Sequence, residues 1–233
     1  MTERNREALR AFDDPAAVEA LLNLPQRVLS LVASRKRAGA RAAKIIQTAL
    51  AIELLLNAPV RIQNLAAINL ERHLVEVGAG SVRALHLIFP GWEVKNRNSL
   101  EFPLMDATLE LLDAYLINWR PLLASAPTPF LFPGKRSDKS KGGGALSTQI
   151  KELVFGHTRL DMPAHRFRHA VGKIFLDRNP GQYEAVRLLL GHKSVETTIA
   201  FYTGAESAMA ARHYHTTILN IRSGSSRNVA DRA

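Results

Sequence analysis

Histidines and arginines cluster in the stretch HRFRH, residues 165–169, which leads into an apolar segment. Like charges three or four residues apart on a helix repel one another, so the cluster favours an anion in its midst. Pro163 predicts a helix start, which places His165 and Arg168 in the first two turns and on one face. Because helix N-termini offer free N–H groups and a positive dipole, this spacing indicates a phosphate-binding site. A surface cluster or a buried capping network would also produce the motif.

A second motif, LLLGHKSVETTIAFYTG, covers residues 188–204. It predicts a helix that ends at Gly191, then His192 directly after it, then a short helix that carries Tyr202. Taken alone, Tyr202 would be a packing aromatic with a hydrated hydroxyl. Beside His192 and the histidine–arginine cluster, a chemical role for that hydroxyl becomes the stronger interpretation.

The motifs HRFRH, LLLGHKSVETT and FYTG resemble those of the tyrosine recombinases, the phage-integrase family of site-specific DNA recombinases. The resemblance covers roughly residues 11–220, nearly the whole chain. Members of the family carry, in this order, an arginine, a lysine, an H-x-x-R pair, a further histidine or tryptophan, and a tyrosine nucleophile. The matching positions in this sequence are Arg61, Lys95, His165, Arg168, His192 and Tyr202.

Two upstream segments supply the first arginine and the lysine of this resemblance. NAPVRIQNLAAINL is similar to the family segment around the arginine, although Asn64 stands at the position of the usual acid and Pro59 departs from the usual glycine pattern. GWEVKNRNSLEFPL predicts a β-hairpin turn that carries Lys95, with Arg97 as a competing candidate on the same turn. The alternative interpretation is that Lys95 is a solvated lysine of the hairpin without a chemical role.

The position of the tyrosine departs from the family by one residue. The separation between His192 and Tyr202 exceeds the commonest family spacing by one, which on a helix means a rotation of ~100° and a shift of ~1.5 Å. Phe201 would be in phase but has no hydroxyl, and Tyr214 belongs to the following helix and lacks the T-T-x-x-x-Y context. We therefore expect Tyr202 to be the nucleophile.

The resemblance implies cleavage and rejoining of DNA through a 3′-phosphotyrosine intermediate. In the family's terms, His165 accepts the phenol proton and Lys95 protonates the leaving 5′ oxygen. The two arginines bind the charge on the non-bridging oxygens, and His192 donates a hydrogen bond to the phosphate or holds the tyrosine. No cofactor and no metal is implied, since two guanidiniums neutralise the phosphate. His165 and His169 have the i, i+4 spacing of a zinc site, but Arg168 between them would repel a cation.

Hydrophobic periodicity predicts a mainly α fold with one small antiparallel β-sheet, the class of the tyrosine-recombinase catalytic domain. The period shortens towards two only between residues 74 and 104, where short apolar stretches alternate with glycine and asparagine. A glycine-rich stretch at 136–146 predicts a mobile loop. Helices are expected over 15–23, 26–37 and 41–56, and as about five short segments between 147 and 220.

The chain is expected to be one catalytic domain between a short lead-in and a disordered tail. Most relatives have a separate DNA-clamping domain before the catalytic one, which favours a piece of a longer recombinase over a minimal recombinase that binds DNA with help from elsewhere. Met209, Ile218 and Leu219 offer apolar side chains for packing, either onto a neighbouring protomer in a tetrameric synapse or within the same domain. The three parts span residues 1–10, 11–220 and 221–233.

The charge balance favours a polyanionic partner, with double-stranded DNA as the first choice. Lysine and arginine number 31 against 21 acidic residues, which gives a net charge of +10. A charged, solubilising surface is the alternative. There are no cysteines, and the longest apolar run is interrupted by Glu53 and Asn57, which indicates neither disulfides nor a membrane span and favours a cytoplasmic, nucleoid-associated protein. A basic run is a candidate for phosphate contacts or for a solvated helix end; it comprises Arg35, Lys36, Arg37, Arg41 and Lys44.

Two other functions compete with site-specific recombination. An enzyme of the type IB topoisomerase kind would nick and reseal one strand without a recognised sequence. A DNA-binding module that has lost catalysis would keep the fold, although the intact set of six residues argues against such decay.

Overall fold

The protein is described by a computed structural model over residues 7, 9–34, 39–78, 84–202, 211 and 214–222. A short 3-10 turn, η1 (Ala11–Asp13), precedes helices α2 (Pro15–Leu22) and α3 (Leu24–Ala33). Asp14 caps α2, because its side chain accepts a hydrogen bond of 2.9 Å from the N–H of Ala16. Both predicted helices are present; the second begins two residues earlier than expected, and residues 35–37 of that prediction lie outside the described part.

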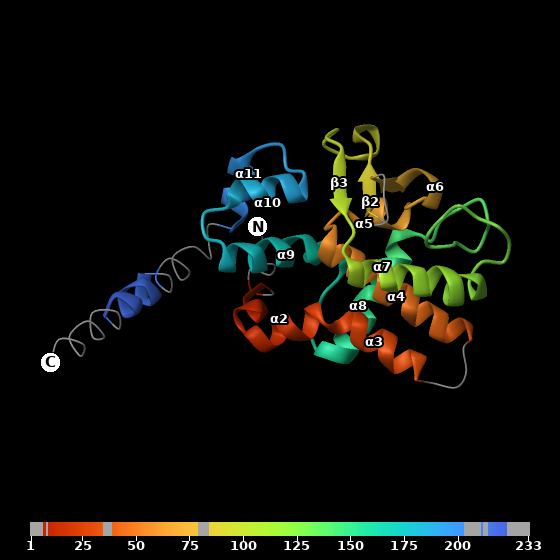
Figure 1. The fold of residues 1–233 in the computed structure, drawn as a ribbon, viewed down its shortest axis with the longest axis horizontal. Helices are drawn as coiled ribbons and strands as arrows, with labels where there is room; N and C mark the ends of the chain where they lie inside the picture. Colours follow the sequence, from red (N-terminus) through yellow and green to blue (C-terminus); the bar gives the residue numbers. More distant parts are fainter. Residues whose placement is uncertain are drawn as a thin grey trace.

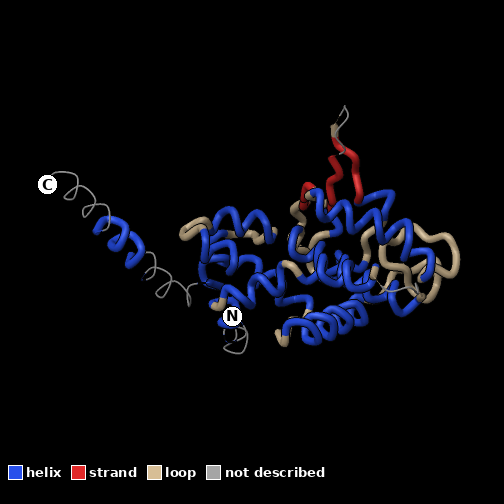
Figure 2. Tube along the Cα trace, turned by 60° about the horizontal axis from the view of Figure 1, so that its bottom comes forward, coloured by secondary structure: helices blue, strands red, loops and turns tan. Residues whose placement is uncertain are grey.

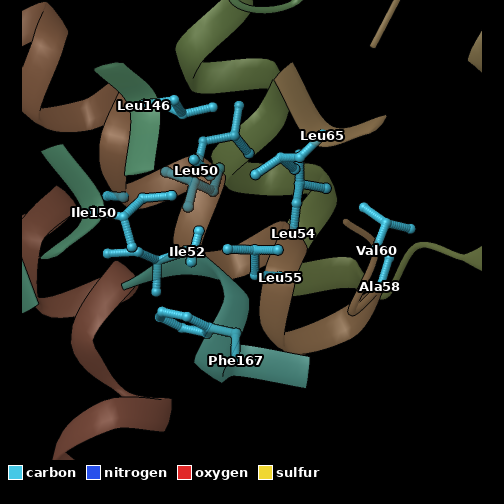
Figure 3. Packing of buried hydrophobic residues seen from close by; sticks show 14 of the residues in the cluster. Leu50, Ile52, Leu54, Leu55, Ala58, Val60, Leu65, Leu146, Ile150 and Phe167 are labelled. Carbon is cyan, nitrogen blue, oxygen red and sulfur yellow. The ribbon is translucent and has the colours of Figure 1, made fainter. Parts of the chain in front are cut away.

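Helix α4 (Ala40–Asn57) is the centre of the molecule, as the all-round apolar pattern of residues 41–56 predicted. Figure 3 shows its leucines and isoleucines packed against side chains from neighbouring helices, Phe167 among them. Glu53 lies within this core and is satisfied there: its Oε1 accepts hydrogen bonds of 2.9 Å from Thr108 Oγ1 and from Asn57 Nδ2. The helix ends before Pro59, as expected.

The sheet confirms the predicted β-rich patch. Two short helices, α5 (Ile62–Ala66) and α6 (Leu70–His73), lead into three antiparallel strands in the order β1-β2-β3. In the register, Leu87 of the middle strand faces both Leu74 and Phe102. Figure 2 shows the strands at one edge of a helical body. They span β1 (Leu74–Val77), β2 (Ala84–Phe89) and β3 (Leu100–Pro103), with a 3-10 turn η2 (Gly91–Glu93) after β2.

The predicted glycine-rich loop is shorter than expected. Helix α7 (Asp106–Ala114), the π-helical turn η3 (Tyr115–Trp119) and η4 (Arg120–Leu122) come first, and α8 (Gly143–Thr158) then begins within the stretch 136–146. Gly143 is buried against α5, where an added Cβ would lie 2.9 Å from Gln63 Oε1. The glycine therefore allows a close helix–helix approach, which local sequence alone did not reveal.

The last part of the described fold carries most of the predicted chemistry. Helices α9 (Ala164–Arg178) and α10 (Tyr183–Leu190) run antiparallel, and α10 ends facing β3 (Figure 1). Helix α11 (Val195–Tyr202) then packs back on α10. With α8 and the helical residues 214–222, these segments agree with the prediction of about five short helices.

The mainly helical fold with its small antiparallel sheet confirms the predicted fold class. The domain limits at residues 11 and 220 stay predictions. Most of the lead-in, Met209 and the tail beyond 222 lie outside the described residues. Within the described parts of the chain, no helix combines the length and the apolar character that crossing a membrane requires.

Candidate active site

Arg168 is fixed inside the molecule by two backbone carbonyls. It lies in the second turn of α9 and is only 8% exposed. Its guanidinium donates to the carbonyl of Pro59, just after α4, and to the carbonyl of Leu190 at 2.6 Å, at the end of α10. Burial, followed by the nearby charge of Arg61, lowers the pKa of Arg168 to about 10. The guanidinium therefore joins three segments and stays charged at neutral pH.

Arg61 stands beside this group at the start of α5. Its backbone is extended, at the N-cap position, and its side chain is half-buried. Within the described residues, neither Arg61 nor Arg168 forms an ion pair with a carboxylate. The guanidinium of Arg61 also has no hydrogen-bond partner among these residues. Two neighbouring guanidiniums repel each other, so this arrangement is suited to an anion that both can bind.

His192 lies directly after the end of α10, as the motif predicted. Gly191 ends the helix in the left-handed conformation, with φ of 59°, which a glycine adopts without strain. His192 Nδ1 is 2.9 Å from the hydroxyl of Thr198, which is fully buried on α11. Burial, followed by the charges of Arg168 and Arg61, lowers the pKa of His192. The imidazole therefore lies at the double-arginine site and is neutral at pH 7.

Tyr202 is buried rather than presented at a surface. Its side chain is 3% exposed and packs in a small apolar cluster with Val186 and Leu190. A Cβ added at Gly172 of α9 would overlap the phenol oxygen, which lies 3.5 Å from the carbonyl of His169. Burial raises the pKa of the Tyr202 phenol, and the charge of Arg168 opposes that shift. Tyr202 thus packs as an ordinary core aromatic would, the alternative weighed in the sequence, and also lies near the arginines.

Lys95 is exposed on the β2–β3 connection, as predicted. Its neighbour Asn96 donates a hydrogen bond of 2.5 Å from Nδ2 to the carbonyl of Gly191. An added Cβ at Gly191 would also lie 2.9 Å from a methyl group of Leu100, in β3. The lysine turn is therefore docked against the loop that carries His192. The competing candidate Arg97 lies on the same turn and is also exposed.

His165 is the second residue of α9 and is exposed. Burial of its ring, followed by the charge of Arg166, lowers its pKa, while Asp161 opposes the shift. The neighbouring His169 is more deeply placed. Burial lowers its pKa to about 4, with further contributions from Arg168, His165 and His192. The structure thus groups Arg61, Arg168, His192 and Tyr202, with Lys95 and His165 exposed nearby.

Three residues of this region were missed in the sequence. Thr198 holds His192 and lies four residues before Tyr202, so helical spacing could have indicated it. Gly172 and Asn96 carried no local signal, because their roles depend on contacts with α11 and with the end of α10. Asn64, noted as a departure from the family acid, donates from Nδ2 to the carbonyl of Glu93 at 2.9 Å and so anchors η2.

The predicted basic run is only partly described. Arg41 and Lys44 line a shallow pocket between α4 and α8, together with Gln149 and Glu152. Arg35, Lys36 and Arg37 lie outside the described residues. The side chain of Phe201, the in-phase alternative to Tyr202, also lies outside them.

Comparison with known sequences decides the family. The sequence model of the phage integrase family matches residues 24–209, which is most of the chain. The chain belongs to the phage integrase family. The match includes all six positions singled out in the sequence. No curated protein sequence matches this phage integrase chain significantly.

Solved structures share the fold of this phage integrase family member. XerH site-specific recombinase bound to palindromic difH substrate superposes with a TM-score of 0.59 at 15% identity, over 82% of this chain and 51% of that one. XerA recombinase gives a TM-score of 0.53 at 18% identity, over 84% and 61%. The Tn1549 transposon integrase in complex with transposon right end DNA gives 0.50 at 17% identity, over 86% and 64%. The chain thus spans about half to two thirds of the length of these proteins.

Proposed function

We propose that this chain is the catalytic part of a site-specific DNA recombinase or integrase that cuts and rejoins DNA through a 3′-phosphotyrosine at Tyr202. The observation that carries the proposal is the pair of adjacent guanidiniums, Arg61 and Arg168, which no described carboxylate neutralises. A phosphodiester supplies the missing anion, and its two non-bridging oxygens match forked donors. Membership of the phage integrase family supports the same conclusion.

Each of three residues has one role in the proposed transesterification. The phenol oxygen of Tyr202 attacks phosphorus, its proton passes to His165, and the P–O5′ bond breaks as Lys95 protonates the leaving oxygen. The lowered pKa of His165 keeps its imidazole neutral near pH 7, the form that accepts a proton. Rejoining runs the same steps backwards, with a free 5′-hydroxyl as the attacking group.

Binding to DNA must be coupled to a shift of α11. Tyr202 is buried and its oxygen lies in a recess over Gly172, so a duplex phosphate reaches it only after the phenol has moved. His192 is suited to report this movement, because it contacts Thr198 on α11 and lies beside the arginines. We assign it the role of binding the phosphate while holding α11 through Thr198.

The partners follow from the same proposal. Double-stranded DNA is the substrate, in line with the XerH and Tn1549 integrase structures, whose proteins are bound to DNA. Synapsis would bring copies of the chain together. Tyr214, Leu219 and Ile221 are exposed on the helical residues 214–222, as expected for a segment that packs on a neighbouring protomer. A cytoplasmic protein associated with the nucleoid fits this activity.

A covalent-trapping experiment tests the proposal. Nicked suicide duplexes of random sequence are incubated with the protein at low salt and with metal chelated, and adducts are separated on denaturing gels. We expect an adduct with the wild type, none with Tyr202→Phe, and an unchanged yield with Tyr214→Phe. The control tyrosine is 63% exposed and so tests whether any accessible phenol reacts.

Other outcomes separate the competing functions. An adduct that persists in Tyr202→Phe would contradict the assigned nucleophile. Retention of DNA without any adduct would favour a DNA-binding module without catalysis. Relaxation of supercoiled plasmids lacking any common sequence would favour strand nicking and resealing of the topoisomerase kind.

A further inference from the structure

The connection between β2 and β3 presents a tryptophan to solvent. Trp92, in η2, is 83% exposed, which is more than any other large apolar side chain of the described residues. Tryptophan is ordinarily among the well-covered residues, because its ring buries a large apolar area. A single exposed apolar side chain is common on protein surfaces, so the case for a partner depends on the loop and the charges around the ring.

The backbone around Trp92 is firmly held. The buried residue Val94 donates its N–H to the carbonyl of Gly91 at 3.1 Å, and Gly91 lies so close to Arg97 that an added Cβ would be 2.5 Å from its carbonyl oxygen. Asn96 ties the following turn to Gly191. The exposed ring therefore stands on a closed, supported loop and not on a loose one.

Glu93, next to Trp92, fixes the same loop to α6. His73 Nδ1 accepts the N–H of Asn69 at 2.8 Å, so its Nε2 carries the hydrogen donated to Glu93 Oε2, also at 2.8 Å. Arg72 adds an ion pair of 3.2 Å to the other carboxylate oxygen. With the bond from Asn64 to the Glu93 carbonyl, both the side chain and the backbone next to the tryptophan are anchored.

The charges beside the ring indicate which partner covers it. Lys95 and Arg97 are exposed on the same loop, and neither forms an ion pair with a described residue. Arg97 has a φ of 60°, a left-handed conformation that is uncommon outside glycine and is found at functional loops. An aromatic ring between cations is suited to a nucleic-acid contact, in which the ring packs on an exposed base or a base step and the cations bind phosphates.

We propose that Trp92 stacks on the DNA beside the cleaved phosphate and so sets the position of the Lys95 loop on the duplex. The proposal rests on the function proposed above, since it takes the loop of Lys95 as part of the DNA-binding face. Because the hairpin is bound to Gly191, a ring seated on the DNA would align the lysine with the site formed by Arg168 and His192.

The test uses the two tryptophans of the chain as its probes. Trp119 is 8% exposed, so red-shifted, acrylamide-accessible emission comes from Trp92. A fluorescein-labelled random duplex is titrated into the Tyr202→Phe protein, with anisotropy reporting binding independently. We expect the emission of Trp92 to be quenched in step with the anisotropy and its acrylamide accessibility to fall. The difference between this protein and its Trp92→Phe derivative isolates the Trp92 signal.

Affinity supplies a second measurement. We expect Trp92→Ala to weaken duplex binding roughly fivefold or more, the cost of losing one stacked aromatic, and Trp92→Phe to weaken it less. The matched control is Ile117→Ala, at an exposed apolar residue in η3, which should bind DNA as the parent does.

The failures of the two proposals are distinguishable. If the anisotropy rises while Trp92 stays as accessible as in the free protein, the stacking proposal is wrong and the recombinase proposal stands. If no duplex is bound at all, both are wrong. If Trp92 becomes protected on raising the protein concentration without DNA, the ring belongs to a contact between copies of the chain, and its assignment to DNA is overturned.

Discussion

The arginine site and the tyrosine helix are attached to the molecule in different ways. Arg168 follows Phe167, a residue of the large core, and is held by carbonyls that follow α4 and end α10. Tyr202 belongs to a separate cluster of four buried side chains, with Leu176, Val186 and Leu190. A small apolar cluster opens more readily than a large core, because its opening exposes less apolar surface. The protein thus combines a fixed pair of arginines, the proposed anion site, with a helix that is held by fewer apolar contacts and carries the proposed nucleophile.

The largest expected effect comes from substituting the arginines of the proposed anion site. Arg168→Ala leaves the carbonyls of Pro59 and Leu190 without their donor, which should cost about 2–4 kcal/mol of unfolding free energy and on the order of 10²–10³ in the rate of adduct formation. Arg61→Ala should lose a similar rate with little change in stability, since its guanidinium has no described hydrogen-bond partner. Urea unfolding and trapping kinetics measure both. Equal destabilisation by the two substitutions would contradict the expectation that only Arg168 also stabilises the fold.

The next effect is a dependence of the free energy of unfolding on pH, which we expect from His169 on α9. His169 in the folded protein takes up a proton only near pH 4, whereas in the unfolded chain it does so near 6.5. The unfolded state therefore binds more protons in this window, and stability should fall by up to about 3 kcal/mol as the pH drops from 6.5 to 4. His169→Gln should flatten that part of the profile, measured as urea midpoints at several pH values. If stability depends on pH equally steeply in His169→Gln, groups other than His169 cause the dependence.

A smaller effect should follow from filling the recess under the tyrosine. A methyl group at position 172 overlaps the phenol oxygen, so Gly172→Ala should expel Tyr202 and lower its pKa towards 10. Helix propensity gains about 1 kcal/mol, but overpacking costs about 1–3 kcal/mol, so a small net loss of stability is expected. Absorbance titration of the tyrosines measures the pKa.

The control for this substitution is Gly156→Ala. Gly156 lies within α8, where an added Cβ meets nothing within 4 Å. This variant should gain the helix propensity alone and leave the tyrosine titration unchanged. A Gly172→Ala protein with the same tyrosine titration as the wild type would show that α11 is as firmly held as the arginine site.

The smallest expected effect concerns the contact that joins the two regions. Thr198→Val keeps the shape of the buried side chain and removes the hydroxyl bound to His192 Nδ1, at a cost of about 1 kcal/mol. Hydrogen exchange of the α11 amides should become faster while that of α9 is unchanged. Thr197→Ser, at an exposed position of the same helix, keeps the hydroxyl that contacts Ser194 and is the matched control; it should leave both rates as they are.

Local signals explain what the sequence predicted well. Helix α4, the strands between residues 74 and 104, and the left-handed Gly191 are each encoded by nearby residues, through apolar periodicity or the special backbone freedom of glycine. The grouping of Arg61, Arg168, His192 and Tyr202 followed from the family resemblance, since residues so far apart in the chain carry no pattern that joins them.

Contacts between distant segments explain what was missed. Gly143 begins a helix within an expected loop because α5 lies against it, through Gln63. The burial of Tyr202 depends on the pairing of α11 with Gly172 of α9. No property of the motif TTIAFY distinguishes a presented phenol from a covered one, because the surface that covers it comes from another helix.

The spacing along α9 also sets a scale for the motion that the proposed catalysis requires. Arg168 and Gly172 are four residues apart on this helix, so they share a face and their Cα atoms are separated by about 6 Å along the axis. The position of the Tyr202 phenol and the Cα atom of Arg168, the proposed phosphate-binding residue, are thus about one helical turn apart. A displacement of this size is within the range of a helix that slides or tilts on the microsecond-to-millisecond timescale. Helix α11 could therefore carry Tyr202 to the arginines while α9 keeps its position.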